Sequence, residues 1–236
     1  WHANRHIMNS SNWKMRRESV RLYYFTSARF GLEAIRDQRL KISTVGDLND
    51  PFEWLSITGD RHVRRVMRKA RAELGAQLGL ICFSSSCRHP LLWAHYADNH
   101  RGLCLGFDIK EHNELREVDY IRERMGWSEF RSLTSEEGVR ILLSYFSVKF
   151  DAWSYESEYR MVVELGNQDP VSGLFFQSFQ PHMTLRQVLV GERCDITRRQ
   201  LDRVLGSEFE EVERFKVRAA FRNFDIVRNL RESAWN

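Results

Sequence analysis

Two glutamates in the second half of the chain have the spacing that most clearly permits chemistry. Glu156 and Glu158 lie two residues apart within residues 153–162, and alternate residues of an extended strand share one face. Two carboxylates that close raise the pKa of one of them, or they need a cation or a hydroxyl-bearing ligand between them. Neighbouring aromatic side chains, Tyr155 among them, would supply flat apolar walls. A carboxylate beside such walls suits a reaction that passes through an oxocarbenium ion.

The same pair of glutamates also has a purely structural interpretation. If residues 157–165 form a strand at the edge of a sheet, both carboxylates are solvated and Arg160 is their partner on the surface. Spacing by itself leaves the catalytic and the structural interpretation open.

The loop at residues 47–53 is the second segment with unusual chemistry. Its Asn-Asp-Pro sequence predicts a turn, because Pro51 disfavours the helical conformation at Asp50. The loop could cover a ligand, and Asp47, Asp50 and Glu53 could hold the divalent metal of a nuclease. Acidic residues equally suit the first turn of a helix, whose dipole favours negative charge there. We favour this second interpretation and expect no metal cofactor.

A group of histidines and cysteines occupies residues 87–104. Zinc sites pair their ligands at short spacings such as Cys-x-x-Cys, which this group lacks, so we do not expect zinc. Trp93 and Tyr96 in the same segment are expected to line a core or a pocket wall. The residues of the group are Cys87, His89, His95, His100 and Cys104.

Arginine dominates the positive charge of the chain, which carries a formal net charge of +4. Of the 36 cationic residues 30 are arginine, the side chain best suited to bidentate phosphate recognition. A GC-rich genome would produce the same excess. Residues 61–75 predict a helix with Val63, Val66, Met67, Ala70 and Leu74 on one face and Arg61, Arg64, Arg65, Arg68 and Arg71 on another. The arginine face suits a phosphate backbone, although a solvated helix face has the same pattern.

The order of the expected elements favours an α+β fold, with mixed or antiparallel central sheets and flanking helices. We expect an N-terminal extension at residues 1–21 and a single domain at 22–236; residues 1–7 precede Met8 and are compatible with a vector-derived leader. We predict strands at 22–26, 40–44, 79–84, 102–107, 157–165, 173–179, 185–191, 214–220 and 224–228, and helices at 29–38, 61–75, 90–97, 134–148 and 196–206.

The sequence contains neither a membrane span nor a secretory signal. No uncharged apolar run approaches the roughly 18 residues of a membrane helix, and the N-terminal residues lack an apolar segment. The four cysteines are too few for a disulfide framework. We therefore expect a cytoplasmic protein that does not interact with membranes.

Several short motifs together resemble a bacterial family known only as a domain of unknown function, of the DUF-2971 type. They span about residues 22–195 in the family's order. The motifs are Leu-Tyr-x-Tyr-like at 22–26, Asn-Asp-Pro-Phe-Glu at 49–53, Cys-Phe-Ser at 82–84, Trp-x-His-Tyr-Ala…His-x-Gly at 93–102, Gly-Phe-Asp at 106–108 and Trp-x-x-Glu-x-Glu-Tyr-Arg at 153–160.

A second resemblance, to ADP-ribosyltransferases of the DarT-like toxin group, implies a function. In that superfamily a residue of the first strand, with a nearby Thr or Ser, holds NAD, and Tyr24 and Thr26 match these positions. Tyr24 stands where the toxins have His. The catalytic glutamate of the superfamily opens a core strand, as Glu158 would, and Glu156 matches the acid that orients the acceptor. Aromatic residues that could stack on nicotinamide are Tyr23, Tyr24, Trp93 and Tyr155.

This resemblance implies an NAD-dependent transferase, a toxin or phage-defence effector that modifies DNA or RNA. NAD would be a substrate, and Arg61, Arg64, Arg65 and Arg68 would bind the nucleic-acid acceptor. Such a toxin needs a restraining partner, either an antitoxin or a chaperone. The alternative is a non-catalytic nucleic-acid-binding or regulatory module that uses the same arginine-rich surface.

Overall fold

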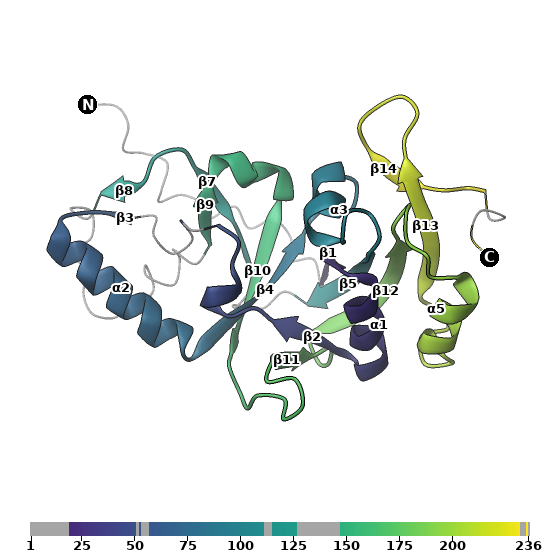
Figure 1. Cartoon of the computed structure of the whole chain (residues 1–236), viewed down its shortest axis with the longest axis horizontal. Helices are drawn as coiled ribbons and strands as arrows, with labels where there is room; N and C mark the ends of the chain where they lie inside the picture. The colour runs from purple at the N-terminus through teal and green to yellow at the C-terminus, as the bar shows by residue number, and fades with distance from the viewer. Residues whose placement is uncertain are drawn as a thin grey trace.

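The chain is built around one large mixed sheet. The computed structural model describes residues 19–50, 52, 57–110, 115–126, 147–231 and 235. Eight strands of this part form the sheet, in the order β14-β13-β12-β5-β1-β4-β10-β6 (Figure 1). Neighbouring strands are antiparallel except β12 and β13, which are parallel. The eight strands are β1 (Ser19–Thr26), β4 (Leu78–Ser84), β5 (Leu103–Lys110), β6 (Leu115–Glu117), β10 (Glu158–Glu164), β12 (Met183–Val190), β13 (Glu213–Ala219) and β14 (Ile226–Arg228).

Helices and short two-stranded sheets complete this α+β architecture, and the predicted fold class is confirmed at that level. Among the described residues no helix is both long and apolar enough to cross a bilayer. The elements outside the large sheet are α1 (Ala28–Asp37), α2 (Arg61–Gly75), α3 (Pro90–Tyr96), α5 (Arg198–Leu205), the 3₁₀ helices η1 (Val45–Asp47) and η3 (Asp151–Glu156), and strands β2 (Arg39–Ile42), β3 (Ile57–Thr58), β7 (Asp119–Ile121), β8 (Met125–Gly126), β9 (Val148–Phe150) and β11 (Phe175–Ser178).

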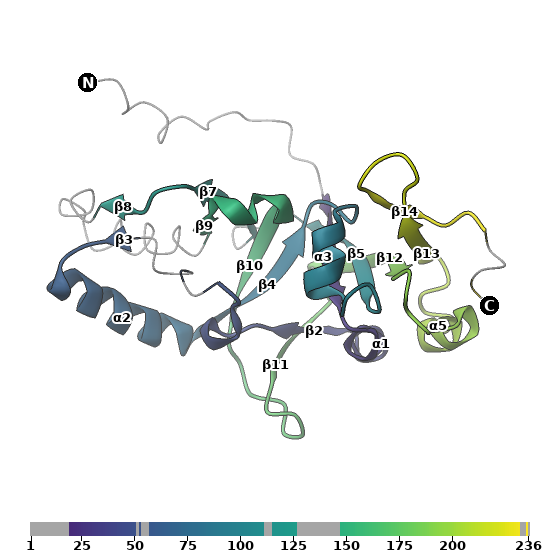
Figure 2. The same ribbon diagram turned by 45° about the horizontal axis from the view of Figure 1, so that its top comes forward.

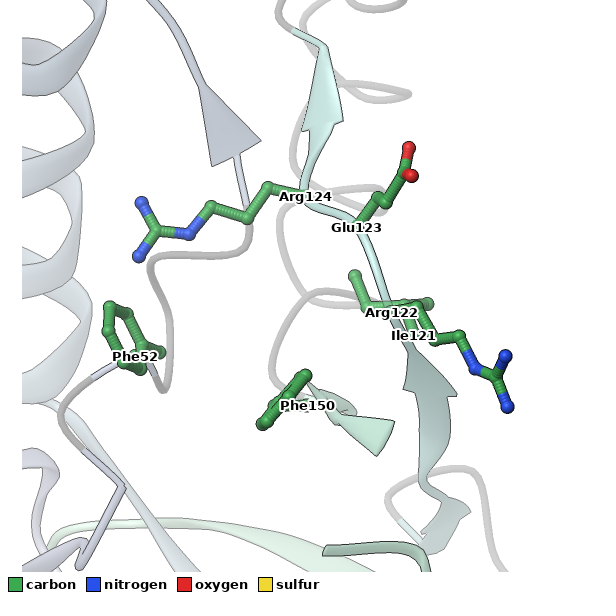
Figure 3. Close-up of a pocket in the computed structure, with 6 residues that line it drawn as sticks. All are labelled: Phe52, Ile121, Arg122, Glu123, Arg124 and Phe150. Atoms are coloured by element: carbon green, nitrogen blue, oxygen red, sulfur yellow. The ribbon is translucent and has the colours of Figure 1, made fainter. Parts of the chain in front are cut away.

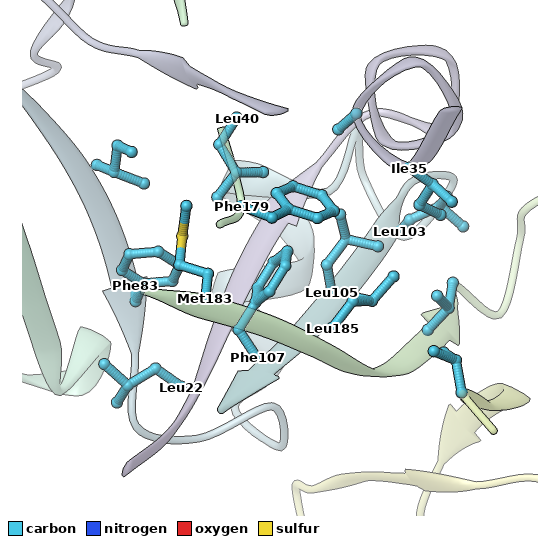
Figure 4. Packing of buried hydrophobic residues seen from close by; sticks show 14 of the residues in the cluster. Leu22, Ile35, Leu40, Phe83, Leu103, Leu105, Phe107, Phe179, Met183 and Leu185 are labelled. Carbon is cyan, nitrogen blue, oxygen red and sulfur yellow. The ribbon is translucent and has the colours of Figure 1, made fainter. Parts of the chain in front are cut away.

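The two faces of the sheet are covered by different helices. In β1, Leu22 belongs to the main core with residues of α1 and α5, whereas Phe25 belongs to a second core around Trp93 of α3. Strand β5 alternates in the same way, because Leu105 joins the main core and Cys104 joins the second. Figure 4 shows the main core, where the Phe107 and Phe179 rings meet edge to face at 4.9 Å.

Most element positions follow the sequence prediction because the helix signals are local. Helix α2 begins after Asp60, whose carboxylate accepts a hydrogen bond from the Val63 amide, and it ends at Gly75 as predicted. Strand β1 begins at Ser19, three residues inside the predicted extension. Of the helix predicted at 134–148, residues 134–146 lie outside the described part, and Val148 begins β9 instead.

The sheet divides between β1 and β4, and this division creates the site. Tyr23 and Ser84 are the single registered pair between these two strands, whereas β1 runs in register with β5 along its whole length. Strand β4 pairs instead with β10 from Ser84 to Leu78. Beyond Tyr23 the two halves of the sheet therefore separate, and the Tyr24 ring meets Phe83 of β4 edge to face with ring centres 6.1 Å apart.

A glycine fixes helix α3 against the end of β1. The Gly102 amide donates to the carbonyl oxygen of Ala97 at 2.7 Å, closing the turn after α3. A Cβ atom at residue 102 would overlap the carbonyl oxygen of Thr26 and lie 2.8 Å from the carbonyl carbon of Ala97. Because both obstacles are backbone atoms, neither can rotate away.

Replacement of Gly102 by alanine is expected to destabilise the fold. Overpacking typically costs about 1–3 kcal/mol, and a clash with backbone belongs at the upper end. Gly166→Ala is the matched control, because a Cβ there meets nothing within 4 Å, and its effect should stay within about 0.5 kcal/mol. Urea denaturation of both variants measures the difference, and equal unfolding midpoints would contradict this account of the turn.

Candidate active site

A cavity of about 230 Å³ occupies the opening between the two halves of the sheet. Tyr24 and Phe83 contribute its wall from the sheet, Tyr96 contributes the wall from α3, and the 45–49 segment closes another side. Charged side chains from β9, η3 and β10 complete the lining: Lys149, Glu156 and Glu158. The cavity thus combines aromatic walls with a group of buried charges.

Lys149 lies between the two glutamates and forms an ion pair with each. Its Nζ atom lies 2.6 Å from Oε2 of Glu156 and 3.2 Å from Oε2 of Glu158. It also lies 5.0 Å from the centre of the Trp153 ring. The Lys149 side chain is 3% exposed, so these attractions act with little screening by solvent. The cation that two neighbouring carboxylates require is therefore supplied by the protein itself.

Arg160 holds Glu158 from the other side. Its Nε donates to Oε1 of Glu158 at 2.8 Å and its second terminal nitrogen donates to Oε2 at 3.0 Å, a bidentate geometry that fixes the plane of the carboxylate. Arg160 is fully buried. The Glu158 amide donates to the hydroxyl of Tyr120 at 2.9 Å. The predicted structural alternative is therefore wrong: β10 lies between β4 and β6, the glutamates are buried, and Arg160 is not on the surface.

Glu156 has a more polar and less charged environment than Glu158. The Tyr96 hydroxyl donates a short hydrogen bond to Oε1 of Glu156, and the Asn49 amide donates to that hydroxyl at 2.7 Å. The Ser84 hydroxyl donates to the main-chain carbonyl of Glu156 at 2.6 Å. Residues from the 45–49 segment, α3 and β4 therefore all fix the position of Glu156.

The two carboxylates converge through a turn rather than through strand alternation. Glu156 is the last residue of η3, and Ser157 has a left-handed backbone with φ of 44°. Strand β10 begins only at Glu158. The prediction that both side chains share a strand face is therefore wrong in its mechanism, although both do reach Lys149. A left-handed residue at a non-glycine position costs energy and is held here by the surrounding contacts.

Burial and neighbouring charges shift the pKa values of Glu156 and Glu158 in opposite directions. Burial raises the pKa of Glu156, and the attraction of Lys149 only partly offsets it. Burial acts to raise the pKa of Glu158 as well, but Arg160 and Lys149 together outweigh it and lower that pKa to about 2. Glu158 is therefore ionised at neutral pH, while Glu156 is the carboxylate that more readily accepts a proton.

Tyr24 connects the cavity to a second, larger hollow of about 670 Å³. Its pKa is raised to about 12 by burial, so the hydroxyl is neutral. Tyr24 lines both hollows, and Thr26 lines only the second. The second hollow is lined by four cationic side chains, and three carboxylates of the same lining pair with its three arginines. The cations are Arg29, Arg36, Arg39 and Lys41, and the carboxylates are Glu33, Asp37 and Asp169.

Two of the aromatic residues predicted to stack on a ligand, Trp93 and Tyr155, lie outside the lining of the cavity. Trp93 is fully buried, its indole donates to the Cys87 carbonyl at 2.7 Å, and its ring meets Phe25 edge to face. The prediction for Trp93 is therefore wrong, because no ligand can reach its ring. Tyr23, by contrast, lines the cavity, and its hydroxyl donates to the Gln187 side chain at 3.5 Å. Tyr155 stacks on His89 with ring centres 5.2 Å apart, outside the lining of the cavity.

The arginine face of α2 points outward, as predicted. Arg61, Arg64, Arg65 and Arg68 are all exposed. On the opposite face Val63 and Met67 are buried, whereas Val66 is 38% exposed and does not join them. The face is available to a partner but lies on a different element from the carboxylates.

The described residues contain no group of three or more His, Cys, Asp or Glu side chains that could hold a metal. Glu53 of the predicted acidic set lies outside the described part. Asp47 accepts from the amide of Thr44 at 2.9 Å, and Asp50 accepts from the amide of Phe52 at 2.9 Å. These two carboxylates therefore stabilise turns of the loop.

A third hollow, also about 230 Å³, lies on the far side of β9. Phe52 and Phe150 face it, Arg124 extends over the Phe52 ring at 4.7 Å, and Arg122 and Glu123 point away (Figure 3). All six of its lining residues are exposed or half-buried. Because it lacks a buried titratable group, we place the chemistry in the first cavity.

Sequence reasoning named Arg160 as a partner of the glutamates but missed Lys149 and the tyrosine hydroxyls that complete the site. Lys149 directly follows the helix predicted at 134–148 and belongs to no recognisable motif. The apolar-polar-apolar order of Val148, Lys149 and Phe150 is nevertheless typical of a strand. Tyr96 was expected on a pocket wall, which is confirmed, but its bond to Glu156 joins residues 60 positions apart. Tyr120 had no signal in the sequence.

The low pKa of Glu158 predicts a specific dependence of stability on pH. A carboxylate whose pKa is depressed on folding contributes stability above its unfolded pKa, and that stability is lost as the pH falls through the folded value. A fall from 4.5 to about 2 corresponds to about 3 kcal/mol. The difference in free energy of unfolding between wild type and Glu158→Gln should therefore narrow by about this amount between pH 5 and pH 2.

Urea titrations across this pH range make the measurement. Glu164→Gln, at the exposed end of the same strand, is the control. Its free energy of unfolding should differ from that of wild type by the same amount at every pH. If the difference in free energy of unfolding between Glu158→Gln and wild type is also the same at every pH, the pKa of Glu158 is not depressed.

Removal of the shared ammonium is expected to be costly. Lys149→Met leaves two buried carboxylates with one fewer cation, and breaking a buried ion pair typically costs about 3–5 kcal/mol. Lys69→Met is the control, because the Lys69 side chain is 77% exposed and pairs only loosely with Glu73 at 3.6 Å. Its effect should stay within about 0.5 kcal/mol. Urea denaturation at pH 7 measures the free energy of unfolding of both variants. Equal losses of stability in Lys149→Met and Lys69→Met would show that Lys149 does not stabilise the buried glutamates.

The comparisons with known proteins are consistent with the first of the two resemblances. Residues 92–161 match the family model described as "Protein of unknown function (DUF2971)", a range that contains Tyr96, Lys149, Glu156, Glu158 and Arg160. No curated protein and no solved structure matches the chain. The family description names no activity, so the chemistry must be argued from the site.

Proposed function

We propose that the protein is an NAD-dependent ADP-ribosyltransferase, with the fold of that superfamily. The observation that carries the proposal is the pair of carboxylates at one cavity whose pKa values are shifted in opposite directions. Pairs of this kind are typical of active sites in which one acid stays ionised and the other exchanges a proton. The resemblance of residues 22–26 and 157–162 to DarT-like toxins adds the substrate.

The two glutamates have separate roles in this reaction. The bond between the ribose C1′ and the nicotinamide nitrogen breaks, nicotinamide leaves with the bonding electrons, and an oxocarbenium ion develops on the ribose. Glu158, ionised and held rigid by Arg160, stabilises that positive charge. A nucleophilic atom of the acceptor then bonds to C1′, and Glu156 takes the proton that the acceptor loses. Tyr96 and Lys149 hold Glu156 in place for this transfer.

The two neighbouring hollows share Tyr24 and offer separate places for the two ends of NAD. The first provides the carboxylates and the Tyr24 and Tyr96 rings for the nicotinamide riboside end. The second, larger hollow offers arginines for the pyrophosphate. Arg39 is the strongest candidate, because it pairs with Asp169 at 2.9 Å and stacks on Phe176 at 3.9 Å, which pre-orients its guanidinium. Tyr24 belongs to both hollows, and Thr26 belongs to the second.

We propose nucleic acid, DNA or RNA, as the acceptor, with Arg61, Arg64, Arg65 and Arg68 of α2 contacting phosphates. The exposure of all four arginines supports this assignment. By the same resemblance we propose a cytoplasmic toxin or phage-defence effector that is restrained by an antitoxin or chaperone.

A second candidate is a non-catalytic module that binds nucleic acid. It is favoured by the observation that all four carboxylate oxygens of Glu156 and Glu158 already have partners, as a purely structural network would require. This candidate predicts nucleic-acid binding that depends on salt but not on NAD.

Loss of the Glu158 charge tests the enzyme directly. The protein is incubated with labelled NAD and a panel of single-stranded DNA, duplex DNA, RNA and cell lysate, and nicotinamide release is measured in parallel. Glu158→Gln should lower label transfer by about 10²–10⁴-fold, the usual effect of removing such a group. Glu164→Gln on the same strand should transfer label at the wild-type rate.

Glu156→Gln separates the two roles. It should lower transfer to the acceptor more than it lowers nicotinamide release, because only transfer needs the proton acceptor. Circular dichroism confirms that each variant is folded. Wild-type rates from folded Glu158→Gln, or no nicotinamide from any wild-type mixture, would leave the binding module as the function.

A further inference from the structure

The hairpin formed by β13 and β14 presents two phenylalanines to solvent. Its connecting residues, 220–225, project from the molecule beside α3 in both views (Figures 1 and 2). Phe221 is 87% exposed and Phe224 is 95% exposed. Exposed aromatic side chains grouped on one projection are typical of interaction sites rather than of ordinary surface. The proposed reaction uses neither residue.

Hydrogen bonds hold the tip of the hairpin in one conformation. The Ala220 amide donates to the carbonyl of Asp225 at 2.8 Å, and the Asn223 side chain donates to the Asp225 carboxylate at 2.9 Å. Arg88 joins this carboxylate at 2.7 Å, and its carbonyl accepts from the Ile226 amide at 2.8 Å. The two rings are therefore displayed on a fixed support.

The charge of the hairpin is strongly positive. Residues 213–231 contain six cationic and two acidic side chains, so this segment alone carries a charge equal to the +4 of the whole chain. Both acids are paired, Asp225 with Arg88 and Glu213 with Arg228 at 2.6 Å. The Arg218 guanidinium lies 4.1 Å from the centre of the Phe221 ring. The tip thus alternates aromatic rings with guanidinium groups: Arg218, Phe221, Arg222 and Phe224.

We propose that this hairpin binds single-stranded nucleic acid, with unpaired bases stacked on Phe221 and Phe224 and phosphates held by Arg218 and Arg222. Exposed rings interleaved with cations are the combination by which proteins hold single strands, since each base offers a face for stacking and each nucleotide a phosphate. A duplex keeps its base faces stacked inside and offers only phosphates to such a surface. The hairpin therefore selects a single strand, whereas arginines alone, as on α2, do not discriminate.

The hairpin is connected to the cavity through the loop before α3. Arg88, which binds Asp225, is followed by His89, whose ring stacks on Tyr155 next to Glu156. These contacts join the support of the hairpin to the segment that carries Glu156, and we take the bound strand as the acceptor of the proposed transfer. In this role as acceptor the inference rests on the proposed function; the binding itself does not.

Fluorescence anisotropy with the full chain tests the binding. The probes are labelled 20-nucleotide single-stranded DNA and RNA of mixed sequence and the corresponding duplex, at several salt concentrations. Phe221→Ala/Phe224→Ala should weaken single-strand binding by at least about tenfold, and the exposure of both rings leaves folding unaffected.

Arg218→Gln/Arg222→Gln should lower the slope of log affinity against log salt by about 0.7 per arginine. Arg199→Gln/Arg203→Gln on α5, both exposed, removes the same charge elsewhere and should change affinity less than twofold.

Several results would overturn the proposal. These are wild-type affinity in the phenylalanine variant, equal affinity for duplex and single strand, or no binding at low salt. Binding of the tip to phospholipid vesicles in place of oligonucleotides, or a dimer that the phenylalanine variant abolishes, would assign the rings to another partner and overturn it as well.

Measuring oligonucleotide binding and nicotinamide release on the same wild-type and hairpin-variant proteins distinguishes the two proposals. Hairpin-dependent binding that persists while no mixture releases nicotinamide would support the hairpin and reject the transferase. Nicotinamide release and label transfer without hairpin-dependent binding would reject the hairpin and support the transferase.

Discussion

The ammonium of Lys149 is the group on which the arrangement of the site depends. It is within ion-pair distance of both Glu156 and Glu158, and without it the two carboxylates would repel each other in a region with little solvent. Arg160 balances the second negative charge, so that these four side chains carry no net charge. A neutral group of this kind can be buried at tolerable cost when each charge also has hydrogen bonds, as each glutamate has here.

The cavity and the charges have a common structural origin. Because β1 and β4 share only one registered pair, the sheet opens beside Tyr24, and side chains from β9, η3 and β10 reach the opening. The left-handed residue Ser157 then turns Glu156 toward Lys149 before β10 begins at Glu158. A continuous strand through this segment would have placed Glu156 in register with its neighbours, away from Tyr96. The break in regular structure is what gives the two glutamates different surroundings.

The parts of the structure that sequence predicted well depend on local interactions. The amphipathic spacing and Asp60 cap define α2, and apolar runs define β4 and β5. The importance of Glu156 and Glu158 was also recognisable, because two acids among aromatic residues form a rare local pattern. Arg160, two residues from Glu158, was named as a partner, but its burial was not predictable. The contact of Glu156 with Tyr96, which spans 60 residues, was not predictable either. Burial of Trp93 likewise depends on packing against Phe25, which no periodicity reveals.

The energetics of buried charges favour a chemical over a structural explanation of the site. Replacing a complete buried ion cluster by apolar residues of similar volume is often neutral or stabilising, although removing one member alone is costly. Such a cluster therefore adds little net stability to a core that already has aromatic and aliphatic packing on both faces of the sheet. A cluster that contributed only to folding would be better placed away from any opening. This one lines a cavity, beside a neutral tyrosine and next to a hollow lined by arginines and carboxylates, and in the proposed reaction its fixed charges would face the substrate.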